Sequence, residues 1–215
     1  MVVSGVDALG HALEAYLTTL CTPITDALAL QAVGMLYEKL RPAVTSDDLD
    51  AKEACLIGST LANMACGNAR LGLLHTMTTP MEGMFKIPHG IAIGVLLPYV
   101  MQFNLPASFE RFANLARAMG EPDDGRSLRE LALVSISAIE RLFGGLGFPR
   151  KYEKPQVDPK ATPEMARIVM GGLYAARDFT KEYPMSALVP SANIRKGTMA
   201  DVIKLFEKAF EGWEL

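Results

Sequence analysis

The chain has 215 residues, which is enough for one domain with a sizeable hydrophobic core. Half of the residues are hydrophobic and 21% are charged, a composition that excludes an intrinsically disordered chain. The formal net charge is -3, so the basic excess that is typical of a nucleic-acid-binding surface is lacking.

The apolar segments and the cysteines bear on where the protein works. The longest apolar run, residues 91–100, is interrupted by Gly94 and Pro98 and is too short to cross a bilayer. The first four residues lack the charged region and cleavage site of a signal peptide. No paired spacing links the cysteines, which we expect to be free, buried thiols without a metal role: Cys21, Cys55 and Cys66. A cytoplasmic protein with no membrane contact is predicted.

Helix start and stop signals divide the sequence into helices. Ser4 is a candidate N-cap of the first helix, and Thr22 followed by Pro23 opens the second, which Pro42 is expected to end. Residues 46–48 cap a third helix, and Thr198 caps the last. The predicted helices cover about residues 4–20, 23–41, 48–69, 71–84, 89–104, 109–119, 126–142, 163–176 and 199–210.

Strand signals are lacking throughout. No run of residues alternates with period two, and no glycine-rich phosphate loop follows a strand. The sequence therefore predicts an all-α fold, a bundle of roughly eight or nine helices that forms a single domain over residues 1–215.

The three histidines of the chain and one aspartate suggest a metal site. Asp7 and His11 are four residues apart, so they lie on one face of the first helix, among apolar residues. Such polar groups are costly to bury unless they pair with each other or share a third partner. His75 and His89 also lie in apolar segments. Three imidazoles and one carboxylate are a plausible ligand set for Fe(II) or Zn(II).

These motifs, in this order, resemble the iron-containing (group III) alcohol dehydrogenase family. The resemblance rests on DALGHALEAY at residues 7–16, GLLH at 72–75 and PHG at 88–90. It extends to Pro23 and to shorter matches at residues 26–29, 50–52, 67–69 and 96–98, and it weakens beyond about Asn104.

The resemblance implies a metal-dependent alcohol dehydrogenase. Members of the family combine an N-terminal domain that binds NAD(P) with a C-terminal helical domain that holds a divalent metal. The family's ligand positions fall on Asp7, His11, His75 and His89, with iron expected and zinc as the alternative. The N-terminal domain has no counterpart here, so the chain is expected to be the metal-binding half only. The expected substrate is a small alcohol or aldehyde, and the face left by the absent domain could support a homo-oligomer.

Two positions depart from the family pattern. Many members have a further histidine four residues after the position of His75, where this chain has Thr79. The Thr79 hydroxyl could relay a proton, but it cannot act as a general base near neutral pH. Residues 193–195 read Asn-Ile-Arg in place of Asn-Pro-Arg, and we expect Arg195 to be a surface residue.

Two other functions are kept as alternatives. A metal-dependent hydrolase or lyase would need a carboxylate base near the metal, and Glu14 and Glu82 are the candidates by position. Glu14 could share the face of His11, although we expect it to be an ordinary carboxylate at the helix surface. A non-catalytic helical interaction module fits the fold, but it leaves the histidines and the aspartate unexplained.

Overall fold

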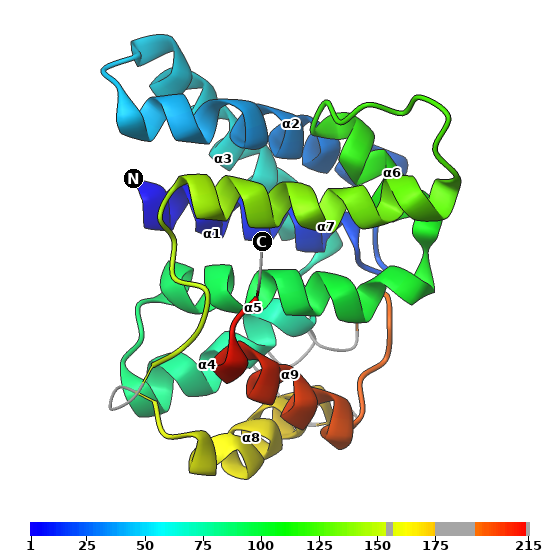
Figure 1. The fold of residues 1–215 in the computed structure, drawn as a ribbon. Coiled ribbons are helices and arrows are strands. Elements are labelled where there is room, and N and C mark those ends of the chain that lie inside the picture. The colour runs from blue at the N-terminus through cyan, green and yellow to red at the C-terminus, as the bar shows by residue number, and fades with distance from the viewer. Residues whose placement is uncertain (154–156, 175–191, 214–215) are drawn as a thin grey trace.

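The computed structural model describes residues 1–153, 157–174 and 192–213, and within them it has nine α-helices, two short 3-10 helices and no strand (Figure 1). The predicted all-α fold is confirmed. The α-helices are α1 (Val2–Tyr16), α2 (Pro23–Thr45), α3 (Leu49–Ala69), α4 (Leu73–Phe85), α5 (His89–Asn104), α6 (Phe109–Ala118), α7 (Leu128–Gly145), α8 (Thr162–Tyr174) and α9 (Met199–Glu211).

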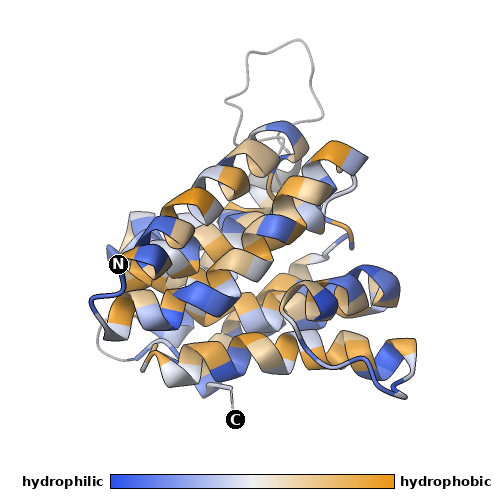
Figure 2. Ribbon diagram, turned by 90° about the horizontal axis from the view of Figure 1, so that it is seen from above, coloured by the Kyte–Doolittle hydropathy of each residue, from blue (hydrophilic) through white to orange (hydrophobic). Residues whose placement is uncertain are grey.

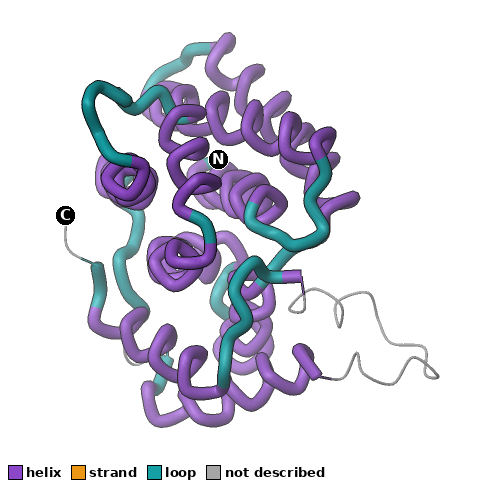
Figure 3. Tube along the Cα trace, turned by 90° about the vertical axis from the view of Figure 1, so that its right-hand side faces the viewer, coloured by secondary structure: helices purple, strands orange, loops and turns teal. Residues whose placement is uncertain are grey.

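Helices α1 and α5 lie in the middle of the molecule. α1 packs against α2, α3 and α5, and α5 packs against α1, α4, α7 and α9. In Figure 1, α2, α3 and α6 lie on one side of this pair and α4, α8 and α9 lie on the other. Figure 3 shows the same helices from the side. The first turns of α4 and α5 are thereby brought to the side of α1.

Burial follows the apolar pattern of the helices. Most helices carry both hydrophobic and hydrophilic residues along the ribbon (Figure 2). α5 differs, because nearly all of its residues are buried. In the described part of the chain, His89–Ala107 is the one helical stretch with the length and apolarity of a membrane span, and 78% of it is buried inside the protein. Its apolar character is therefore explained by its place as the core helix of the bundle.

Helix caps were predicted better than helix ends. Thr22, Asp48 and Thr198 accept N-cap hydrogen bonds as expected. The prediction for Ser4 was wrong: α1 begins at Val2, and the Ser4 hydroxyl donates to the Met1 carbonyl at 3.1 Å. Pro42 does not end α2, which continues to Thr45, since a proline in a last turn removes a single N–H from the helix.

Other boundaries shift by a few residues. The predicted end of the eighth helix at Ala176 lies outside the described residues. Cys55 is buried as predicted, whereas Cys21 and Cys66 are only partly buried, because they lie toward the solvent-facing sides of their segments.

Asn193 connects the ends of three helices. Its Oδ1 accepts from the Leu73 backbone N–H at the start of α4, at 3.2 Å. Its Nδ2 donates to Oδ1 of Asn104, at the end of α5, at 2.8 Å. The next residue, Ile194, donates its N–H to the Leu17 carbonyl just after α1, at 3.1 Å. A proline at position 194 would have no N–H for this bond, so the departure from the family pattern adds a tie to α1.

Arg195 is not the surface residue that we expected. It is half-buried, its Nη1 donates to the Phe103 carbonyl at 2.6 Å, and its guanidinium lies over the Phe103 ring at 4.1 Å from the centroid. The Phe103 carbonyl in the last turn of α5 and the Phe103 ring offer the guanidinium both a hydrogen bond and a cation–π contact.

We predict that Asn193→Ala destabilises the fold. The substitution leaves the Leu73 N–H and the Asn104 side chain without their buried partner, which costs about 2 kcal/mol or more of the free energy of unfolding. Urea denaturation measures this change. Asn63→Ala is the matched control, because Asn63 is exposed and bonds only within its own helix. Equal stability of the two variants would contradict the connecting role of Asn193.

Candidate metal centre

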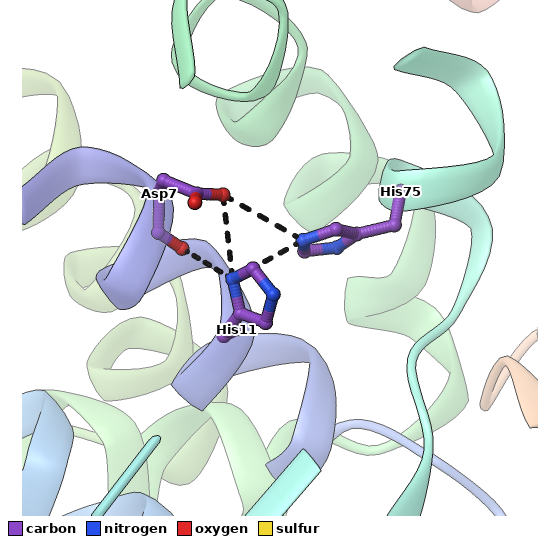
Figure 4. A group of neighbouring side chains, drawn as sticks. All are labelled: Asp7, His11 and His75. Carbon is purple, nitrogen blue, oxygen red and sulfur yellow. Dashed lines mark hydrogen bonds and ion pairs between the residues drawn. The ribbon is translucent and has the colours of Figure 1, made fainter. Parts of the chain in front are cut away.

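The four predicted ligands lie where α1 passes the first turns of α4 and α5. Asp7 and His11 are one turn apart on α1, His75 is the third residue of α4, and His89 is the first residue of α5. Figure 4 shows the side chains of Asp7, His11 and His75 pointing toward one another. Donor atoms of these three residues lie within 4.8 Å of one another. His89 lies outside that tight set but reaches Asp7.

The distances centre on Oδ1 of Asp7. It lies 3.3 Å from Nδ1 of His11, 3.8 Å from Nε2 of His75 and 3.2 Å from Nε2 of His89. Nε2 of His75 lies 3.3 Å from Nδ1 of His11. Ligands of a tetrahedral ion at 2.0–2.2 Å are about 3.3–3.6 Å apart. The donor atoms therefore have the spacing that a small divalent ion requires.

Oδ1 of Asp7 is itself buried without a hydrogen bond of acceptable geometry. Three ring nitrogens surround this carboxylate oxygen, yet none directs an N–H at it well. A buried unpaired carboxylate oxygen is costly. A cation between the oxygen and the ring nitrogens would remove that cost, so the residues present fit the metal that the sequence predicts.

The electrostatics of the cluster favour positive charge. Burial raises the pKa of the Asp7 carboxyl, but the imidazoles of His11, His75 and His89 outweigh it and hold this pKa well below its usual range. The Asp7 carboxylate, with burial opposing and Glu82 adding, raises the pKa of His89 to about 9. Burial lowers the pKa of His75, but Asp7 and Glu14 raise it overall. Surroundings that hold protons on imidazoles also attract a metal cation, which competes with those protons.

The cluster is closed on one side and open on the other. The side chain of His75 is 8% exposed, whereas those of Asp7 and His89 are 28% and 36% exposed. Thr79 lies one turn after His75 on α4 and is exposed. A small molecule can therefore approach from the side of Asp7 and His89, while the side of His75 is sealed by the protein.

Glu14 is the main functional residue that the sequence misjudged. It is buried, not on the helix surface as expected, because its Oε2 lies 2.7 Å from Nδ1 of His75. Its Oε1 accepts from the Leu74 N–H at 2.7 Å, and Oε2 accepts from the His75 N–H at 3.2 Å. Burial raises the pKa of Glu14, but His75 and the start of α4 hold it below its usual value. The spacing of Asp7, His11 and Glu14, at i, i+4 and i+7, was the available signal.

Glu82 is the second carboxylate next to the cluster. Its Oε1 lies 2.7 Å from Nδ1 of His89, and its side chain is 41% exposed. It therefore contacts a predicted ligand from the open side, while Glu14 does so from the closed side.

Two close approaches bring the helices together at the cluster. A Cβ on Gly90, next to His89, would clash with the backbone carbonyl oxygen of Val3 in α1. A Cβ on Gly10, between Asp7 and His11, would lie 2.7 Å from Cγ2 of Ile93 in α5. Glycine at these positions lets α1 and α5 approach closely enough for Asp7 to reach His89.

The described part of the chain is all-helical and gathers one aspartate and three histidines into a partly buried cluster, an arrangement that is typical of helical metalloproteins. The family described as "Fe-containing alcohol dehydrogenase family, C-terminal" matches residues 1–210. The chain therefore belongs to the iron-containing alcohol dehydrogenase family.

Relatives and solved structures agree with this assignment. The chain is 37% identical to 1,3-propanediol dehydrogenase of Citrobacter freundii over 96% of its own length and 50% of the relative. It is 40% identical to NAD-dependent methanol dehydrogenase of Bacillus methanolicus over 70% of its length and 40% of the relative. A crystal structure of 1,3-propanediol oxidoreductase, 36% identical, superposes with a TM-score of 0.87 over 97% of this chain and 51% of the other. The chain thus spans about half the length of the curated relatives that it matches.

We predict that Gly90→Ala lowers stability. The added methyl meets a backbone oxygen that cannot rotate away, so α1 and α5 must separate, at a cost of about 1–3 kcal/mol. Thermal denaturation of the metal-free protein measures it. Gly83→Ala in α4 is the matched control, since its Cβ meets nothing within 4 Å and the change should be neutral or stabilising. If Gly90→Ala is as stable as Gly83→Ala, the close approach does not constrain the helices.

Proposed function

We propose that this chain is the metal-binding, catalytic half of an NAD(P)-dependent alcohol dehydrogenase. The observation that carries the proposal is the buried, unpaired Oδ1 of Asp7 surrounded by nitrogens of His11, His75 and His89 at 3.2–3.8 Å. Family membership favours Fe(II) as the ion, and Zn(II) is the alternative that the same donor set accepts.

The metal ligands in this proposal are Asp7, His11, His75 and His89. A divalent ion held there would act as a Lewis acid toward the oxygen of a small alcohol or aldehyde. The chain's own contribution is placement. α1, α4 and α5 each present ligands from regular secondary structure, and buried side chains such as Leu74 and Ile93 exclude water behind them.

The surroundings of Glu14 and Glu82 favour this function over a metal-dependent hydrolase or lyase. Such an enzyme needs a carboxylate that is available as a general base. Glu14 is buried and engaged by three N–H groups, and Glu82 pairs with His89. Both candidate bases are therefore committed to histidines of the cluster.

NAD(P) belongs to the additional length of the related enzymes in this proposal. The matched relatives are about twice as long as this chain, and one is named an NAD-dependent methanol dehydrogenase. α3 exposes Leu56, Ile57 and Met64, a surface that supports contact with a cofactor domain or with a second copy. The relatives are bacterial dehydrogenases and the apolar α5 is buried, which supports a cytoplasmic location.

We predict that the chain binds one divalent ion tightly and that His75→Ala loses this binding. His75 is the most buried of the three histidines, so solvent water has no direct path by which it could take the place of the lost nitrogen ligand. Calorimetric titration of Zn(II), or of Fe(II) without oxygen, into the chelator-treated chain measures the affinity. Asn114→Ala, a change far from the cluster in sequence and on α6, serves as the control. Equal affinity of His75→Ala and wild type would contradict the assignment.

We further predict that the chain alone does not oxidise NAD(P)H with short-chain aldehydes, although it binds metal. Turnover should appear when the N-terminal half of the propanediol dehydrogenase relative is fused to it, because hydride transfer needs the nicotinamide within about 3–3.5 Å of the substrate carbon. In that fusion, Thr79→Val should lower kcat by up to about a hundredfold if its hydroxyl relays a proton, with metal affinity unchanged. Robust turnover by the chain alone would contradict the assignment of NAD(P) to another domain.

A further inference from the structure

We propose that Glu14 and Glu82 are positioning residues of the metal centre. Each accepts a hydrogen bond from Nδ1 of one histidine and so leaves Nε2 of that ring as the unprotonated nitrogen that binds the ion. The inference rests on the proposed metal site, and it assigns a role to two carboxylates that are not themselves ligands.

The first argument is the occupancy of Nδ1 in two of the three histidines. Nδ1 of His75 lies 2.7 Å from Glu14, and Nδ1 of His89 lies 2.7 Å from Glu82. A carboxylate oxygen can only accept, so each of these two Nδ1 atoms carries the proton. Metal-binding histidines use this arrangement to fix the tautomer and the ring orientation.

The direction of Nε2 is the second argument. Nε2 of His75 and of His89 both face Oδ1 of Asp7, at 3.8 and 3.2 Å. With the proton on Nδ1, these nitrogens direct lone pairs toward a carboxylate oxygen. Such a set of acceptors repels itself unless a cation lies between them. His11 is different, because its Nδ1 faces both the carbonyl and the cluster.

The rigidity of Glu14 is the third argument. The first turn of α4 has no cap of its own, since its N-cap residue is Gly72. Glu14 supplies that cap from α1, through the Leu74 and His75 N–H groups, and is only 4% exposed. A Cβ at position 72 would lie 2.8 Å from Oε1 of Glu14, so glycine gives the carboxylate its place. The cap that starts α4 thereby also orients the His75 ring.

Glu82 is held less firmly. Its side chain is 41% exposed. Glu82 lies near the end of α4, and it contacts His89 across the loop that leads to α5. Solvent can replace its bond to Nδ1, so we expect a smaller effect for Glu82 than for Glu14. A larger loss of metal affinity for the Glu14 variant than for the Glu82 variant is therefore what a positioning role predicts.

The test uses carboxylate-to-amide substitutions, which keep the shape and change the hydrogen bonding. Glu14→Gln keeps a single acceptor oxygen and no negative charge, so it cannot accept from the Leu74 N–H and from His75 at once, and it holds the proton on Nδ1 of His75 less firmly. Zn(II) affinity is measured by competition with a chelator. We expect a 10- to 100-fold loss for Glu14→Gln and a smaller, measurable loss for Glu82→Gln.

Glu121→Gln is the matched control. Glu121 is also largely buried, with a side chain 14% exposed, and its partners are Tyr37 and Arg141. Its substitution should change stability but leave Zn(II) affinity at the wild-type value.

A second readout separates positioning from a purely structural cap. Long-range proton–nitrogen spectra of the metal-free chain, recorded above the pKa of His89, show which ring nitrogen carries the proton. Nδ1–H of His75 and His89 is expected in the wild type, and its loss is expected at His89 in Glu82→Gln, a solvent-accessible change that spares the fold. Wild-type affinity and tautomers in both variants would overturn the proposal. Failure of the wild type itself to bind Zn(II) would instead overturn the metal site.

Discussion

The close packing of α1 against the first turns of α4 and α5 is the constraint on which the site depends. Asp7 and His11 can meet His75 and His89 only if these helices approach closely, and Gly10 and Gly90 remove the side chains that would keep them apart. His75 is then presented as the third residue of α4, and His89 as the first residue of α5. Ligands on regular helices are held more rigidly than ligands on loops, which suits a site that must fix an ion.

Charge balance links the packing to the chemistry. Asp7 places its carboxylate among three imidazoles, and its Oδ1 has no hydrogen bond of good geometry. The nearby imidazoles compensate electrostatically, as shown by the lowered pKa of Asp7 and the raised pKa of His89. Protons and a metal ion compete for the same ring nitrogens and for the Asp7 carboxylate. The stability of the metal-free chain and its affinity for metal are therefore coupled at this cluster.

The sequence predicted what depends on local pattern. Helix periodicity, N-caps such as Thr22 and Thr198, and the i, i+4 pair of Asp7 and His11 are encoded within a few residues. The all-α fold class followed from these local signals. The family resemblance then added His75 and His89 to Asp7 and His11 as predicted ligands.

The parts that failed depend on tertiary contacts. Glu14 caps the start of α4 by accepting from Leu74, which lies 60 residues later, and nothing near Glu14 in sequence shows this. Arg195 is held by Phe103, 92 residues away. Pro42 was given too much weight, since a proline in a last helical turn costs little. Buried polar contacts between distant segments are thus the features that sequence reasoning cannot supply.

The measurement that tests the account most directly is a crystal structure of the chain loaded with Zn(II), with anomalous data at the zinc edge. The account predicts one anomalous peak, coordinated by the Asp7 carboxylate and by nitrogens of His11, His75 and His89, at about 2.0–2.2 Å. An anomalous peak at other residues would contradict the assignment of the metal centre. So would hydrogen bonds among Asp7 and the three histidines with no peak between them, in a chain that binds zinc in solution.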